Sequence, residues 1–318
     1  MTAGIMIAIG LTGLFVGGEM LVRGAVTIAK AYGLPPMVIG LTLVGFGTST
    51  PELVTSVQAA LSGSAGIAIG NVVGSNIGNI LLILGVSAML LPLAVARDAL
   101  RRDGSVMIAA TLALLGVVLF GEITRWIGVG FVTALAAYLF VVFRSVSKTK
   151  ETSDAVVYEK EAAAIPGPDL GLSAAIGVAV VGLIATIIGA RLLVDGAISV
   201  AEFAGISETV IGLTVVAIGT SMPELVTAVI AVRKGQGDVV IGNVIGSNLF
   251  NVMGIVGVTA LIHPVTVPVE IATFDIWVLL GASVLLIGFA RTGWTINRLE
   301  GGAFLVAYLG YFGFLLMQ

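Results

Sequence analysis

Two glutamates lie inside two nearly identical and otherwise apolar stretches of this 318-residue sequence. Glu52 belongs to GLTLVGFGTSTPELVTS (40–56) and Glu224 to GLTVVAIGTSMPELVTA (212–228), which match at 12 of 17 positions. Neither glutamate has a basic residue in its own apolar segment. An unpaired acid within a membrane-length apolar segment is costly and marks a functional site by default. Two such acids side by side repel each other, so they need protons, one divalent cation or two monovalent cations.

Further oxygen donors precede each glutamate at helical spacing. Thr48 and Ser49 come four and three residues before Glu52, which places all three on one helical face. Pro51 lacks an N–H and favours a kink, which frees backbone carbonyl groups that need partners inside a bilayer. The second copy supplies the equivalent residues: Thr220, Ser221, Pro223 and Glu224.

A second repeated segment adds a stripe of amides and hydroxyls. IGNVVGSNIGN (69–79) returns as IGNVIGSNLFN (241–251). The first copy puts Asn71, Ser75 and Asn79 at i, i+4 and i+8, which is one face of a helix. The second copy puts there Asn243, Ser247 and Asn251. All-oxygen donor sets select hard cations, and mixed, flexible sets suit calcium better than magnesium.

The composition indicates where these motifs must work. Hydrophobic residues make up 58% of the chain and charged residues 10%, against about 25% charged in soluble domains. The chain is therefore predicted to be a membrane protein whose partner is the lipid bilayer. The absence of cysteine excludes disulfides and thiol chemistry. A net charge of −3 without a basic tail argues against nucleic-acid binding. The sequence gives no indication of the oligomeric state.

A scan for apolar segments of ~20 residues predicts an all-α polytopic fold. We expect a first half at 1–146, a polar loop at 147–169 and a second half at 170–318. The ten predicted transmembrane helices are 3–28, 37–61, 66–91, 104–121, 126–145, 170–201, 208–232, 238–262, 272–290 and 296–317.

Basic residues between these segments predict the orientation. Alternate loops on one side hold twelve of them, and the other side holds only Arg125. Because Lys and Arg concentrate in cytoplasmic loops, the 147–169 loop is predicted to be cytoplasmic and both termini to lie outside. The predicted location is the inner (plasma) membrane.

The repeat also predicts an inverted architecture. Each half contains an odd number of predicted spans, five, so the second half must cross the membrane in the opposite direction. Inverted repeats with a midplane site between them are typical of secondary transporters. The strongest identity lies in polar stretches rather than in packing residues, which favours transport over duplication without function.

Four further charges lie inside predicted spans and have a simpler interpretation. Glu19 and Arg23 are spaced i, i+4 on one segment, and Arg191 and Asp195 occupy the equivalent positions of the other half. We expect two structural ion pairs there.

The doubled GTS-x-PE-L-x-T and GN-x-x-GSN-x-x-N segments resemble the paired alpha repeats of sodium/calcium exchangers, and the compact prokaryotic members most closely. The resemblance implies alternating access, with calcium moved against sodium. It also implies the cation ligands in each half. These are Thr48, Ser49, Glu52, Ser75, Asn79 and the Gly45 carbonyl, and Thr220, Ser221, Glu224, Ser247, Asn251 and the Ala217 carbonyl.

One position departs from part of that family. Some relatives carry Asp at the position of Asn251, and in potassium-dependent relatives this Asp is tied to potassium use. The resemblance therefore implies a site with two formal negative charges and no potassium requirement. The 147–169 loop is too short for the calcium-sensing domains of animal exchangers.

Three alternatives remain at this stage. The same glutamates could exchange calcium, or another divalent cation, for protons. Paired carboxylates could serve a membrane-embedded hydrolase as acid and base, although the sequence has no Ser/His or HExxH arrangement. Oxygen-lined sites also occur in channels. We expect a transporter rather than an enzyme, with no cofactor and with calcium and sodium as the transported ions.

Overall fold

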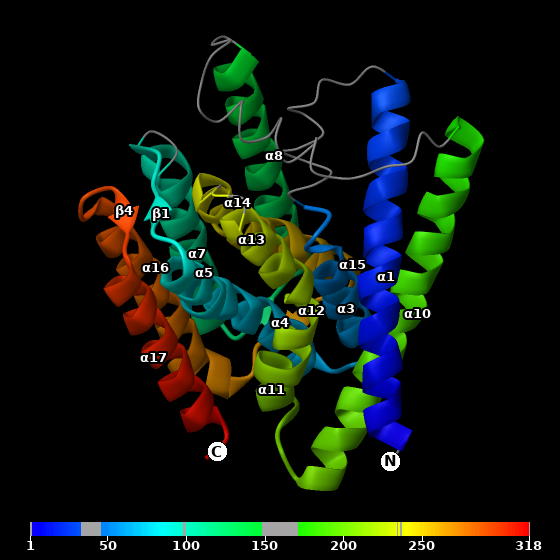
Figure 1. Ribbon diagram of the computed structural model, residues 1–318. Helices are drawn as coiled ribbons and strands as arrows, with labels where there is room; N and C mark the ends of the chain where they lie inside the picture. Colours follow the sequence, from blue (N-terminus) through cyan, green and yellow to red (C-terminus); the bar gives the residue numbers. More distant parts are fainter. Residues whose placement is uncertain are drawn as a thin grey trace.

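The computed structural model describes residues 2–32, 46–97, 100–147, 171–233, 235 and 237–317, which form helices and four short strands (Figure 1). The first half contains α1 (Thr2–Ala31), α3 (Thr50–Leu61), α4 (Ala65–Gly78), η2 (Asn79–Ile83), α5 (Leu84–Leu90), η3 (Leu100–Gly104), α7 (Ser105–Leu119) and α8 (Arg125–Ser147). The second half contains α10 (Leu172–Ala204), α11 (Glu208–Ile211), η4 (Gly212–Val216), α12 (Ala217–Thr220), α13 (Met222–Arg233), α14 (Gly237–Leu249), η5 (Phe250–Ile255), α15 (Val256–Ile262), η6 (Ile271–Asp275), α16 (Ile276–Arg291) and α17 (Arg298–Leu315). The η elements are π-helices.

The described helices make this a multi-pass membrane protein. Seven of them are long and apolar enough to cross a bilayer, and an eighth span results if Glu208–Thr220 and Met222–Arg233 count as one. That pair is bent by 45° at Ser221, as the proline of the second motif predicted. The predicted span at 37–61 lies partly outside the described residues. The count of ten spans and the 147–169 loop therefore stay predictions.

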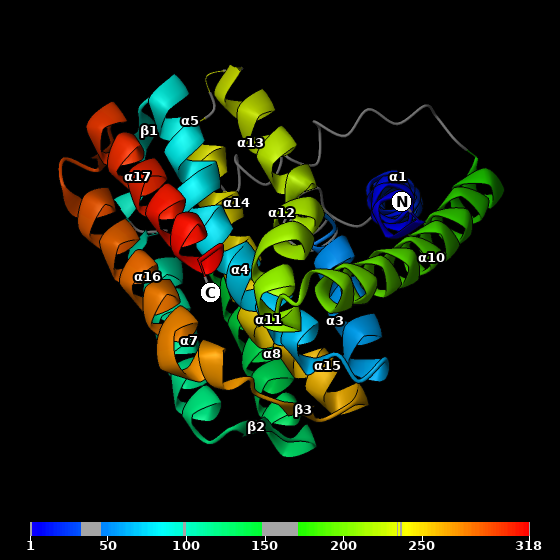
Figure 2. The ribbon, with the colours of Figure 1, turned by 90° about the horizontal axis from the view of Figure 1, so that it is seen from below.

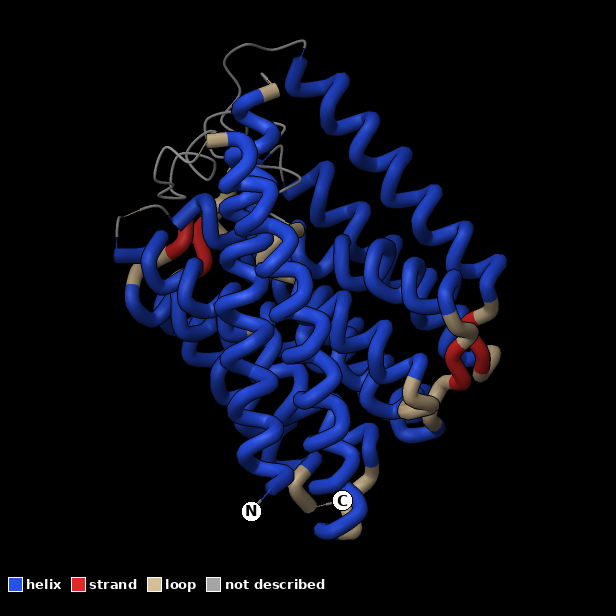
Figure 3. Tube along the Cα trace, turned by 90° about the vertical axis from the view of Figure 1, so that its right-hand side faces the viewer, coloured by secondary structure: helices blue, strands red, loops and turns tan. Residues whose placement is uncertain are grey.

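Two short ribbons connect the halves of the chain. β1 (Leu93–Ala94) pairs antiparallel with β4 (Thr295–Ile296), and β2 (Glu122–Ile123) pairs antiparallel with β3 (Val265–Thr266). Figure 3 shows the two ribbons at separate edges of the helical body. Each ribbon joins a strand of one half to a strand of the other.

The two longest helices, α1 and α10, pack along each other at one side of the body (Figures 1 and 2). Their backbones nearly touch, since a Cβ atom at Gly10 would lie 2.8 Å from the Gly189 carbonyl oxygen. The predicted ion pairs are confirmed: Arg23 binds Glu19 on α1, and Arg191 lies 3.8 Å from Asp195 on α10.

The centre of the body is α4, which is almost entirely buried (Figure 2). Its tight contact with η4 depends on glycine, because a Cβ atom at Gly74 would lie 2.7 Å from the Leu213 carbonyl oxygen. This close approach brings the amide stripe of the first half against the second glutamate motif.

Candidate cation site

The structure brings the two repeated glutamates together through reciprocal hydrogen bonds. The Ser49 hydroxyl donates to Glu224 Oε1 at 3.0 Å, and the Ser221 hydroxyl donates to Glu52 Oε1 at 2.9 Å. Each serine precedes one glutamate in sequence and binds the other. Both carboxylates are buried, with exposed fractions of 1% for Glu52 and 3% for Glu224. The two motifs therefore form one site.

Several buried oxygens of the predicted ligands lack a hydrogen-bond donor. Each glutamate uses Oε1 for the serine, while Oε2 of Glu52 and Oε2 of Glu224 have no partner. No Arg, Lys or His of the described residues forms an ion pair with either carboxylate. Buried polar atoms are normally satisfied, so these exceptions call for an explanation. The other unpartnered oxygens of predicted ligands are Ser75 Oγ, Asn79 Oδ1 and Asn251 Oδ1.

The amides at the ends of both stripes lie in π-helices. Asn79 is the first residue of η2, and Asn251 is the second residue of η5. Such wide turns inside α-helices occur frequently at functional sites. The Asn79 amide donates to Asn248 Oδ1 at 3.0 Å, which leaves its own Oδ1 free of donors. Asn248 in turn donates to the Asn76 carbonyl oxygen at 3.4 Å.

Asn71 holds the site together rather than offering a free oxygen. Its amide nitrogen donates to the Glu52 carbonyl oxygen at 3.1 Å and to Ser56 Oγ at 2.9 Å. Its Oδ1 accepts from the Thr220 hydroxyl at 2.9 Å. Asn71 therefore connects α3 and α4 to the second motif.

The remaining predicted ligands occupy different positions around the pair. Thr48 is half-buried, whereas Thr220 is buried and its hydroxyl is the one that donates to Asn71 Oδ1. The Ser247 hydroxyl donates to Asn243 Oδ1 at 3.2 Å. The Ala217 carbonyl is buried and accepts from the Ser221 backbone N–H at 3.1 Å. Gly45 lies outside the described residues.

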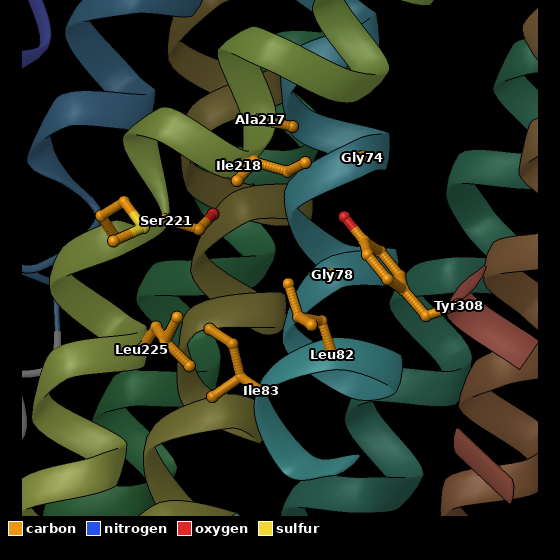
Figure 4. Close-up of a pocket in the computed structure, with 10 residues that line it drawn as sticks. Gly74, Gly78, Leu82, Ile83, Ala217, Ile218, Ser221, Leu225 and Tyr308 are labelled. Atoms are coloured by element: carbon orange, nitrogen blue, oxygen red, sulfur yellow. The ribbon is translucent and has the colours of Figure 1, made fainter. Parts of the chain in front are cut away.

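A small cavity of about 20 Å³ adjoins the site, which is room for roughly one water-sized particle. Ser221 and Ala217 line it on the side of the second motif, and Gly74 and Gly78 line it on the side of α4 and its end. Figure 4 shows the hydroxyls of Ser221 and Tyr308 facing this space from opposite sides.

Sequence reasoning missed several buried polar residues. Asn76 and Asn248 belong to the repeated GSN triplets, but they fall outside the i, i+4, i+8 stripe. Asp275, at 1% exposed, accepts a hydrogen bond from Tyr311 at 2.9 Å. It lies 172 residues after Asp103, which accepts from Tyr138 at 3.0 Å. Glu224 likewise lies 172 residues after Glu52. A search for acids separated by this repeat distance could therefore have found Asp103 and Asp275 from the sequence.

Comparisons with known proteins agree on one family. The family model described as "Sodium/calcium exchanger protein" matches residues 2–144 and 174–317. The "Putative antiporter CaxA" of Alkalimonas amylolytica is 37% identical over 316 residues, with 98% of each chain covered. The "Sodium/calcium exchanger MaX1" of Methanosarcina acetivorans is 36% identical over 338 residues, with 96% of each covered. Among solved structures, the sodium-calcium exchanger NCX_Mj, soaked with sodium and strontium, has a TM-score of 0.63 at 31% identity, with 97% of this chain and 96% of that chain covered.

Proposed function

This chain belongs to the sodium/calcium exchanger family, and from that premise we propose that it exchanges calcium for sodium across the membrane by alternating access. Membership of this family supports cation/calcium antiporter activity, and the proposed function is transport. The finer choice of sodium as the counter-ion rests on the chemistry of the site and on the names of its relatives.

One observation carries the proposal: two buried carboxylates, each bonded by the serine of the other motif, keep one unpartnered oxygen each. Two formal negative charges balance one calcium ion or two sodium ions. Among the described residues no three His, Cys, Asp or Glu side chains cluster as a metal site, and in our proposal neutral oxygens supply the rest of the coordination. Neutral hydroxyl and amide oxygens are common ligands of hard cations.

We assign the ligands to the residues that the two repeats supply. The unpartnered oxygens of Ser75, Asn79 and Asn251 complete the set around the glutamates, with the Thr48, Thr220, Ser49, Ser221 and Ser247 hydroxyls next to them. The Gly45 and Ala217 carbonyls remain part of the proposed set. Calcium and sodium are substrates here, and the proposal requires no cofactor.

The proposed arrangement in the membrane follows the loop charges. The halves 1–146 and 170–318 are inverted repeats of five spans each, the 147–169 loop is cytoplasmic, and both termini are outside the inner membrane. Figure 1 shows the two chain ends on the same side of the body, which agrees with an even number of spans.

Calcium uptake into proteoliposomes tests the coupling ion. Vesicles loaded with sodium and diluted into sodium-free buffer should accumulate calcium, and vesicles with equal sodium on both sides should not. A pH gradient imposed without sodium separates the alternative, because protons could neutralise the same two carboxylates. Uptake driven by that pH gradient and unaffected by sodium would replace sodium/calcium exchange with proton/calcium exchange. Flux that ignores every counter-ion would indicate a channel.

A further inference from the structure

The β1–β4 ribbon presents a tryptophan in an unusual backbone conformation. The Val95 N–H donates to the Trp294 carbonyl oxygen at 2.9 Å, which fixes Trp294 beside the ribbon. Trp294 has a φ of 58°, and it is the one non-glycine residue with positive φ among the described residues. Bulky residues rarely adopt this conformation, and such outliers often accompany function. Figure 1 shows this ribbon at the end of the body far from both termini.

Two arginine side chains converge on that ring. The guanidinium carbon of Arg97 lies 4.8 Å from the centre of the Trp294 ring, and that of Arg101 lies 5.9 Å from it. Both arginines are exposed, and neither pairs with a carboxylate of the described residues. The neighbouring Arg102 is different, because Asp103 binds it through two hydrogen bonds. Two like charges on one ring favour an anion between or beside them.

More positive charge flanks the ring along the chain. Arg291 and Arg298 lie within four residues of Trp294 and are exposed. The acid of this stretch, Glu300, is engaged by the Asn297 backbone N–H and the Thr292 hydroxyl. The sequence places Asp98 next to Arg97, outside the described residues.

Apolar side chains are exposed beside this basic group. Leu299, next to Arg298, is 86% exposed, and Leu90, at the end of α5, is 51% exposed. The helices that carry them, α17 and α5, pack against each other. A free phosphate ion makes no favourable contact with exposed leucine side chains. A phospholipid, by contrast, carries a phosphate group for the arginines and acyl chains for the leucines. Arginine forks suit phosphate, and tryptophan prefers the membrane interface.

We propose that Arg97, Arg101 and Trp294 bind the phosphate headgroup of an anionic membrane lipid at the β1–β4 ribbon. The two guanidinium groups hold the phosphate beside the ring, and Leu90 and Leu299 contact the acyl chains. This site is separate from the carboxylate pair, so it neither supports nor requires the proposed exchange of calcium for sodium.

Lipid titration of the purified full-length protein in detergent tests this site. Dioleoylphosphatidylglycerol should raise the thermal unfolding temperature more than dioleoylphosphatidylcholine. The double variant Arg97→Ala with Arg101→Ala should bind phosphatidylglycerol at least about tenfold more weakly, which corresponds to about 1.4 kcal/mol, because it removes both charge-assisted hydrogen-bond donors of the site.

A matched control removes two other exposed charges. Arg144 also lies over an aromatic ring, that of Phe140 at 4.6 Å, and Arg233 ends α13. The variant Arg144→Ala with Arg233→Ala should keep phosphatidylglycerol binding within about twofold. An equal loss in both double variants would assign binding to net charge and overturn the site. A shift by millimolar inorganic phosphate as large as the lipid's would overturn the lipid as occupant.

A second measurement does not depend on stability. In a chain with Trp126→Phe and Trp277→Phe, Trp294 is the one remaining tryptophan. Phosphatidylglycerol brominated on its acyl chains should quench its fluorescence more than equally brominated phosphatidylcholine. Equal quenching by both lipids would contradict selective binding of the anionic headgroup.

Discussion

The two halves of the proposed cation site have nearly the same sequence but different hydrogen bonds. In the half around Glu52, Asn71 is fully buried and bonds Ser56, the Glu52 backbone and Thr220. Its repeat equivalent, Asn243, is half-buried, and within the described part of the chain it accepts one bond, from Ser247 on its own helix. One substitution contributes to this difference, because Ala228 stands where the first half has Ser56.

The second amide of each stripe shows the same contrast. The Asn79 amide is held by Asn248, whereas both side-chain atoms of Asn251 are buried without a partner. The side-chain amide of Asn76, the equivalent of Asn248, instead donates a hydrogen bond to the Val72 carbonyl oxygen at 2.9 Å. Thus the stripe amides of the half around Glu52 form more hydrogen bonds within the protein than those of the other half. Both halves keep unpartnered oxygens, which in the half around Glu52 are Glu52 Oε2, Ser75 Oγ and Asn79 Oδ1. Sequence identity between the repeats conveys which groups are present but not which of them are already engaged.

The largest expected effect concerns the feature that both halves share. Glu52→Gln and Glu224→Gln should each lower calcium uptake at least about 100-fold, because losing one partner of a buried charge cluster costs about 3–5 kcal/mol. Sodium-driven uptake into proteoliposomes measures this. Glu202→Gln, an exposed residue of α10, is the control and should behave like the unchanged protein. Normal flux in either glutamate variant would refute a two-carboxylate site.

The next effect separates the two halves. Asn71→Ala should destabilise the protein by about 2–3 kcal/mol, since it removes three buried hydrogen bonds. Asn243→Ala, at the equivalent position, should cost about 1 kcal/mol or less for its single bond. Denaturant unfolding in detergent compares the two variants. Equal losses would mean that the halves are energetically alike despite their different hydrogen bonds.

The sequence predicted the shared features because they depend on residue type and spacing. The repeated Glu52 and Glu224, their neighbouring hydroxyls and the bend at the second proline all follow from identity between the repeats and from helical periodicity. The ion pairs at Glu19 and Asp195 follow from i, i+4 spacing. The ion pairs and the bend depend only on residues within one helix turn of each other. The pairing of the two glutamates follows from the expectation that one copy of the repeat faces the other.

The asymmetry was not predictable in the same way. The partner that Asn71 or Asn248 takes depends on how closely α4 approaches the second motif and on where a π-turn begins, and hydropathy encodes neither. Asp275 was missed because a single acid hardly changes the average hydropathy of its span. The count of ten spans relied partly on residues 37–45, which lie outside the described residues.

A smaller effect tests the engaged and the free amide. Asn79→Ala should destabilise the cation-free protein by about 1–2 kcal/mol, because it leaves Asn248 Oδ1 buried without its donor. Asn251→Ala should leave stability unchanged or slightly higher, since it removes two buried atoms that have no partner. Both variants should weaken calcium binding, measured by calcium-dependent thermal stabilisation. Greater destabilisation by Asn251→Ala than by Asn79→Ala would reverse the comparison.

The smallest effect belongs to the serines of the two stripes. Ser247→Ala removes a hydrogen bond to Asn243 and should cost about 1 kcal/mol, whereas Ser75→Ala removes a hydroxyl without a partner and should be neutral for folding. If Ser75 Oγ is a cation ligand, Ser75→Ala separates binding from folding: the cation-free unfolding temperature stays constant while the calcium concentration for half-maximal stabilisation rises several-fold. A loss of stability without calcium would instead assign Ser75 to packing, and the half around Glu52 would then offer one ligand fewer.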